Sequence, residues 1–206
     1  MQVRQLSILT GISYLVIFFA AIFANFVVLE SLKTNPVQTV TTMAFTVRIG
    51  IMAFLITVVC DVVVAWTLWE IYNSQTLNRL STLFRLMHAA LMGVAIYYLP
   101  AIPGMTDAEL IQSNVQHFEI IWLIGLFFFG VHLILLARIF HGPLWIRIFL
   151  AIAGLMYMID TSAHILLQTY QEYAIVFLTL VAVPSMLGEM AFAIWLLLCG
   201  GKNKQG

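Results

Sequence analysis

Charged residues are scarce in this sequence. Only 9% of its 206 residues are Asp, Glu, Lys or Arg, and nine basic residues balance nine acidic ones. A soluble globular domain carries about 25% charged residues, so the composition excludes a cytosolic enzyme and a disordered segment. The lack of a basic surplus excludes a nucleic-acid-binding surface. With only two cysteines, the chain is not a scaffold held together by disulfides.

Long apolar runs take the place of charge, since 63% of the residues are hydrophobic. A helix needs about 20 mostly apolar residues to cross the hydrocarbon core of a bilayer, and six stretches reach that length. The alternation of transmembrane β-strands is missing. The sequence therefore predicts an all-α polytopic membrane protein, a single domain of six transmembrane helices over residues 1–206. The predicted spans are about 8–32, 45–72, 80–99, 118–140, 146–168 and 174–200.

The connections contain recognisable helix starts and stops. Asn35-Pro36 predicts a short interfacial helix before the second span. The capping-box spacing of Thr106 and Glu109 predicts another short helix over about 107–115. Gly142-Pro143 ends the fourth span and begins the fifth within a few residues, so these two spans should be antiparallel neighbours.

Basic residues predict the orientation. They concentrate at the N-terminus, in the second and fourth connections and at the C-terminus, as Arg4, Arg79, Arg138, Arg147, Lys202 and Lys204. The positive-inside rule then places both termini in the cytoplasm, in the inner (cytoplasmic) membrane of the cell. The lipid bilayer is the expected partner, a small-molecule ligand is a second one, no nucleic acid is expected, and the oligomeric state stays open.

Ionisable residues inside the spans are the candidates for function. A central Asp or Arg costs about 2.5–3.5 kcal/mol to insert, so such residues normally face the bundle interior and pair. Helix rise places several of them at similar depth on different spans, which predicts one shared polar cluster in which Arg85 pairs with Asp61. The candidate ligand-binding or proton-relay residues are Asp61, Arg85, His132, Tyr157, Asp160 and Glu189.

Helical spacing refines this cluster. Tyr157, Asp160 and His164 recur at intervals of three and four, which places them on one stripe of the fifth span. Pro184 should free a backbone carbonyl and kink the sixth span beside Glu189. An ion pair made by Arg85 is equally compatible with a purely structural role that fixes helix register.

Two spans carry a central aspartate, Asp61 in the second and Asp160 in the fifth. Division of the chain after the third span would give two three-helix halves of opposite orientation. Inverted repeats of this kind underlie many transporters, so an inverted repeat is an alternative organisation for this chain.

Several short motifs follow one another along nearly the whole chain. They are Gly11-Ile12-Ser13-Tyr14-Leu15, Arg48-Ile49-Gly50, Cys60-Asp61, Phe84-Arg85-Leu86, Phe129-Gly130-Val131-His132, Gly154-Leu155-Met156-Tyr157-Met158-Ile159-Asp160-Thr161-Ser162, Gly188-Glu189 and Trp195-Leu196-Leu197. In these motifs the sequence resembles a bacterial family of small integral membrane proteins catalogued as domain of unknown function 4386.

The resemblance implies a compact six-span protein in which the positions of Asp61, Arg85, His132, Asp160 and Glu189 are typical of the family. It supplies no reaction, cofactor or substrate. The family pattern also has glutamine more often than histidine where this chain has His88, so any mechanism that uses His88 would be peculiar to this chain.

Three functions remain open at this point. The first is binding or transport of a small molecule, or of protons, at the polar cluster, with no cofactor. The second is an intramembrane enzyme in which His88 and His132 hold a haem or a divalent metal, with catalytic residues unknown. The third is a structural or accessory subunit of a membrane complex, in which the polar cluster only holds the bundle together.

Overall fold

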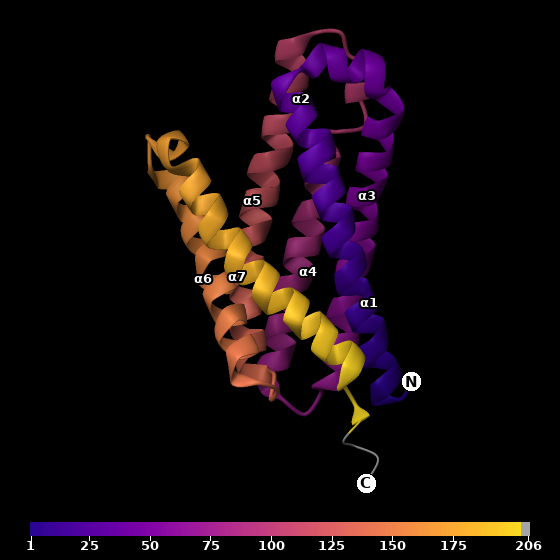
Figure 1. Cartoon of the computed structure of the whole chain (residues 1–206), viewed down its shortest axis with the longest axis vertical. Helices are drawn as coiled ribbons and strands as arrows, with labels where there is room; N and C mark the ends of the chain where they lie inside the picture. Colours follow the sequence, from indigo (N-terminus) through magenta and orange to yellow (C-terminus); the bar gives the residue numbers. More distant parts are fainter. Residues whose placement is uncertain (203–206) are drawn as a thin grey trace.

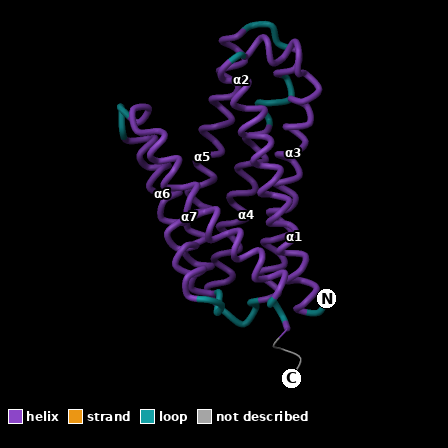
Figure 2. The backbone as a smooth tube through the Cα atoms, viewed as in Figure 1, coloured by secondary structure: helices purple, strands orange, loops and turns teal. Residues whose placement is uncertain are grey.

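Helices connected by short turns make up the computed structural model, which describes residues 1–202 (Figure 2). No strand occurs in that range. Six helical segments are long and apolar enough to cross a membrane, which confirms the predicted all-α six-span architecture. The elements are α1 (Val3–Ile22), the π-helix η1 (Phe23–Leu29), α2 (Glu30–Thr34), α3 (Pro36–Ile71), α4 (Thr76–Ile96), the 3₁₀ turn η2 (Ile102–Gly104), α5 (Ala108–Ile139), α6 (Leu144–Leu166) and α7 (Tyr170–Leu198).

The sequence predicts two short helices in the connections, and one of them is present. The short helix predicted after Asn35 is present as the first turns of α3, because the backbone of Met43 leaves the helical region (φ −124°, ψ 23°) and separates them from the rest. The separate helix predicted over 107–115 is wrong. Asp107 does cap a helix, its carboxylate accepting from the Glu109 backbone N–H at 2.9 Å, but α5 continues unbroken to Ile139. No Pro or Gly interrupts residues 108–118, so nothing ends the helix there.

The helices form a closed ring. Each span packs against the next one in the chain, in the order α1, α3, α4, α5, α6, α7, and α7 packs back against α1. The predicted antiparallel contact of α5 with α6 is confirmed. The start of α1 and the end of α7 lie at one end of the molecule, which we call the terminal end, together with the α3–α4 and α5–α6 turns (Figure 1). At the other end, the α6–α7 hairpin leans away from the remaining helices (Figure 1).

Arg4 closes the ring at the terminal end. Its guanidinium donates to three carbonyl oxygens at the end of α7, those of Leu196 at 3.1 Å and Leu197 at 2.6 Å in the last turn and that of Gly200 at 3.0 Å just beyond it. The last carbonyls of a helix have no partner within the helix and carry partial negative charge. Arg4 therefore joins the first span to the last one, in addition to contributing to the basic charge of this end.

The bundle contains two apolar cores, which lie one after the other along the helix axes. One includes Val28, Phe54, Met92 and Phe118, and α4 contributes apolar residues to it. The second lies at the terminal end, includes Leu133, Phe192 and Leu196, and has no member on α4. In that half α4 buries polar side chains instead, namely Asn78, Ser81, Thr82, Arg85 and His88.

Glycine allows α5 and α6 to touch through their backbones. A Cβ on Gly130 would lie 2.5 Å from the carbonyl oxygen of Gly154, and a Cβ on Gly154 would collide with the carbonyl oxygen of Gly130. Small residues at such crossings are typical of membrane helices, because close approach maximises van der Waals contact. This contact fixes α6 against the helix that carries His132.

We expect Gly154→Ala to destabilise the bundle by about 1–3 kcal/mol, because the added methyl must push two helix backbones apart. Gly93→Ala on α4 is the matched control, since a Cβ there meets no atom within 4 Å; it should be neutral or stabilising by up to ~1 kcal/mol. Thermal unfolding of the purified protein in detergent measures both. Equal melting temperatures for the two variants would contradict the proposed backbone contact.

Candidate intramembrane polar site

Arg85 is the centre of the polar side chains inside the bundle. Only 1% of the residue is exposed. Its Nη2 donates to Asp61 Oδ1 of α3 at 2.6 Å, and its Nη1 donates to the hydroxyl of Tyr14 of α1 at 2.7 Å. Nη1 also lies 3.2 Å from Nε2 of His132 on α5. The predicted pair of Arg85 with Asp61 is confirmed, and one side chain of α4 reaches three other spans.

The contacts of His132 define its tautomer. Because Nη1 of Arg85 has only protons to offer, Nε2 of His132 must accept and therefore carries no proton. Nδ1 then carries the proton and donates to the backbone oxygen of Ser81 at 3.0 Å, with the Ser81 hydroxyl 2.8 Å away. His132 is thus held as a neutral imidazole with protein partners on both ring nitrogens.

His88 lies beside this network and is less completely bonded. Its Nε2 is 3.7 Å from Asp61 Oδ2, while its ring packs on Phe129 with centroids 4.9 Å apart. Nδ1 of His88 and Nε of Arg85 are buried and have no hydrogen-bond partner among residues 1–202. Gly125 faces this imidazole, because a Cβ there would lie 3.2 Å from Nδ1. The site therefore retains unused hydrogen-bonding capacity next to Asp61.

Sequence reasoning missed Tyr14 and Ser81, two partners in this network. Tyr14 was one aromatic residue among many in an apolar span. A usable signal was present, since Ser7, Thr10 and Tyr14 recur at intervals of three and four and are all buried on one face of α1. Thr10 confirms that this face is polar by donating to Thr67 of α3 at 2.8 Å.

Glu189 and Tyr157 form a second group with Ser185 between them. The Ser185 hydroxyl donates to Glu189 Oε1 at 2.7 Å and lies 3.0 Å from the hydroxyl of Tyr157. Ser185 and Glu189 are four apart on α7, which runs continuously through Pro184, whereas Tyr157 belongs to α6. Phe129 of α5 lies between the two groups, because its ring centroid is 5.3 Å from Cζ of Arg85 and 5.6 Å from the ring centroid of Tyr157. The two groups are therefore neighbours that pack against the same aromatic ring.

Asp160 is placed differently from the other candidates. Its carboxylate accepts a hydrogen bond of 2.7 Å from the hydroxyl of Tyr170, at the start of α7. The ring of Tyr170 also packs on the exposed His164, with centroids 4.4 Å apart. Asp160 thus fastens α6 to α7 near their connecting turn, and it does not bond to Arg85 as Asp61 does.

The site has no ready-made metal centre in the part of the chain that the structure describes. No group of three or more His, Cys, Asp or Glu side chains is arranged to hold a metal ion among residues 1–202. A haem or metal bound between His88 and His132 would require His132 to release Arg85 or Ser81. That alternative stays a prediction from the sequence.

The two groups differ in charge balance. Arg85 and Asp61 neutralise each other, as buried charges must in a low-dielectric interior. Glu189 is only partly buried, and no Lys, Arg or His nitrogen lies within 4.0 Å of it among residues 1–202. A carboxylate without a cationic partner at this depth is able to bind a proton or a cation.

We expect the Arg85–Asp61 pair to show strong coupling in a double-mutant cycle. Arg85→Leu or Asp61→Leu alone leaves a buried charge without its partner and should cost about 3–5 kcal/mol of stability. The double variant should cost much less than the sum of the two, since both charges are then gone. Thermal unfolding in detergent measures the cycle, with the exposed Arg79→Leu as control; additive losses would contradict the pairing.

The comparisons with known proteins give a family but no activity. Residues 9–200 match the model of a family described as "Domain of unknown function (DUF4386)". The chain is also 27% identical over 159 residues to an uncharacterized protein of Archaeoglobus fulgidus, a match that covers 74% of this chain and 85% of that protein. No solved structure matches the chain. Because the family model covers nearly all of its length, the chain belongs to the DUF4386 family.

Proposed function

We propose that the protein binds and transports protons, or a small solute together with protons, at Glu189 inside the membrane. The observation that carries this proposal is the charge balance of the site. Arg85 is already neutralised by Asp61 at 2.6 Å, whereas Glu189 has a hydroxyl as its bonded neighbour. An ionisable residue inside a membrane bundle that is not balanced by the protein itself is typical of ion and proton pathways.

The neighbours of Glu189 suit proton transfer. The hydroxyls of Ser185 and Tyr157 can each accept one proton while donating another, and they form a continuous chain from Glu189 to α6 with steps of 2.7 and 3.0 Å. The neighbouring ion pair of Arg85 and Asp61 supplies a fixed dipole. In this proposal Glu189 is the binding residue, Ser185 and Tyr157 relay protons, and Arg85, Asp61 and His132 hold the geometry.

The proposed membrane is the cytoplasmic one, with both termini in the cytoplasm. Arg4, Arg79, Arg138, Arg147 and Lys202 belong to segments that meet at the terminal end of the bundle (Figure 1). Clusters of basic residues at one end of a helical bundle favour the cytoplasmic side. This orientation would place the α6–α7 turn, with Asp160 and Tyr170, on the opposite side.

Two other functions remain as proposals of second rank. His88 supports an intramembrane enzyme, because its buried Nδ1 has no partner among the described residues; a haem there would give the purified protein visible absorption. A purely structural subunit is supported by the number of helices that Arg85 joins, and stoichiometric co-purification of a partner would favour it.

Proton exchange at Glu189 can be observed directly. We expect infrared difference spectra recorded between high and low pH to contain the carbonyl band of a protonated carboxyl group, and we expect Glu189→Gln to remove that band. Glu172→Gln is the matched control, since Glu172 lies on the same helix but is exposed. A band unchanged in Glu189→Gln would show that this carboxyl does not exchange protons.

Transport is tested in sealed vesicles that contain a trapped pH-sensitive dye and a potassium clamp of the membrane potential. Vesicles with the wild-type protein should acidify faster than empty ones under a pH gradient, and Glu189→Gln should return the rate to that of empty vesicles. Glu172→Gln should behave as wild type. Equal rates for wild-type and Glu189→Gln vesicles would contradict the proposed role of Glu189 in proton transport.

A further inference from the structure

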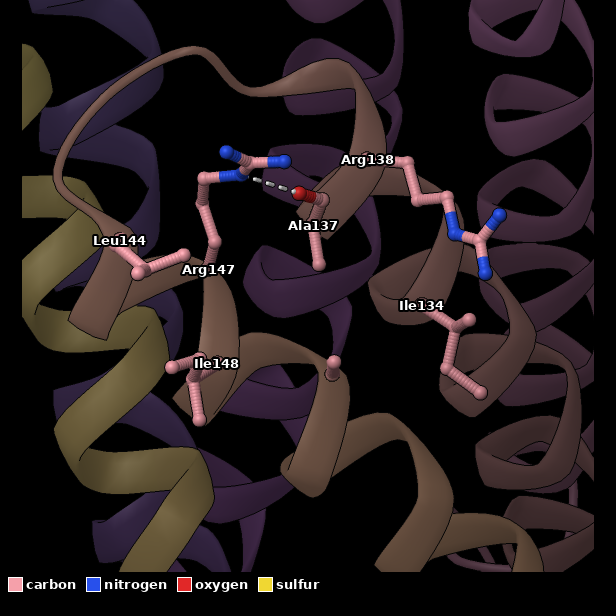
Figure 3. Close-up of a pocket in the computed structure, with 7 residues that line it drawn as sticks. Ile134, Ala137, Arg138, Leu144, Arg147 and Ile148 are labelled. Atoms are coloured by element: carbon pink, nitrogen blue, oxygen red, sulfur yellow. Dashed lines mark hydrogen bonds between the residues drawn. The ribbon is translucent and has the colours of Figure 1, made fainter.

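A surface hollow of about 260 Å³ lies between α5 and α6 at the terminal end of the bundle (Figure 3). Its lining is mostly apolar, with two arginines, and we call it the arginine groove. The small residues Ala137 and Ala151 leave the space that larger side chains would fill. The remaining lining residues are Ile134, Arg138, Leu144, Arg147 and Ile148.

The two arginines differ in how they are held. Arg147 is anchored, because its Nε donates to the carbonyl oxygen of Ala137 at 3.0 Å (Figure 3). Arg138 is exposed in the last turn of α5. Neither guanidinium has an acidic partner within 4.0 Å among residues 1–202. Two positive charges beside one apolar hollow are therefore left without a counter-charge from the protein.

The position of the groove decides which anion can use it. Arg138 is one residue from the end of α5, and Arg147 is in the first turn of α6, so both lie where these spans leave the hydrocarbon. Ile134 lies one helical turn deeper than Arg138, and Ala151 one turn deeper than Arg147. A ligand that fills the groove must thus present a negative group at the membrane boundary and hydrocarbon just below it.

We propose that the arginine groove binds an anionic phospholipid, whose head group lies between Arg138 and Arg147, the two arginines on either side of Ala137 (Figure 3), and whose acyl chain follows Ile134, Ile148 and Ala151. Guanidinium groups pair with phosphate through two parallel hydrogen bonds, and basic pockets between spans are suited to acidic head groups. A free phosphate ion would use only the arginines. The apolar walls distinguish a lipid from a soluble anion, and the proposal does not depend on proton transport at Glu189.

The experiment uses the full chain, purified in detergent, with native mass spectrometry to count bound lipids during titration. Wild-type protein should bind phosphatidylglycerol more tightly than phosphatidylcholine. Arg138→Gln, which removes no hydrogen bond described within the protein, should weaken phosphatidylglycerol binding about fivefold, and Arg138→Gln with Arg147→Gln roughly 25-fold. Arg79→Gln is the control, because Arg79 is an exposed arginine of the same end and lies outside the groove.

A second variant separates a lipid from a free anion. Ala151→Leu keeps both charges but fills the groove, so it should weaken phosphatidylglycerol binding without changing the response of the melting temperature to inorganic phosphate. Three results would overturn the proposal: unchanged lipid binding in the double arginine variant, an equal loss in Arg79→Gln, or wild-type lipid binding in Ala151→Leu. The last result together with displacement of the lipid by inorganic phosphate would indicate a soluble-anion site.

Discussion

The buried guanidinium of Arg85 is the constraint on which the arrangement of the bundle depends. Arg85 must find acceptors inside the membrane, because neither lipid nor water supplies them there. Asp61, Tyr14 and His132 supply acceptors to its two terminal nitrogens from three different helices. Each of these helices is therefore fixed in rotation and in height relative to α4. Apolar packing alone would fix the relative rotation and height of these helices only weakly, because most of their surface is apolar.

The same constraint explains why α4 is the least apolar of the six spans. In the terminal half of the bundle the buried face of α4 is polar, and successive polar residues on this face bond to neighbouring helices. Asn78 donates to the last carbonyls of α3, Ser81 contacts His132, and Arg85 reaches Asp61. Because α4 packs between α3 and α5, these bonds stay within the protein. A helix of this composition is stable in a membrane only when its neighbours supply the partners.

Much of this arrangement can be predicted from the positions of the polar residues in the sequence. The pairing of Arg85 with Asp61 was predictable, since they are opposite charges on consecutive spans in the same half of the bundle. The role of Tyr14 was not, because only the rotation of α1 shows which of its aromatic residues faces inward. Asp160 is among the residues predicted for the shared cluster, but its partner Tyr170 lies at the start of α7, where the geometry of a three-residue turn decides the contact. The helix ending predicted near residue 115 failed because a cap determines where a helix starts, not its length.

The site combines an ion pair whose charges cancel with a carboxylate that has no cationic partner among the described residues. Arg85 and Asp61 neutralise each other's charge whether or not a ligand is present. Glu189 has no cationic partner within 4.0 Å among residues 1–202, and it lies on α7, the helix whose first half leans away from α1 (Figure 1). The last turn of α7 is bound by Arg4, whereas residues 171–180 of α7 contain no buried side chain. The terminal end of α7 is therefore fastened to α1, whereas residues 171–180 pack only through exposed or partly buried side chains.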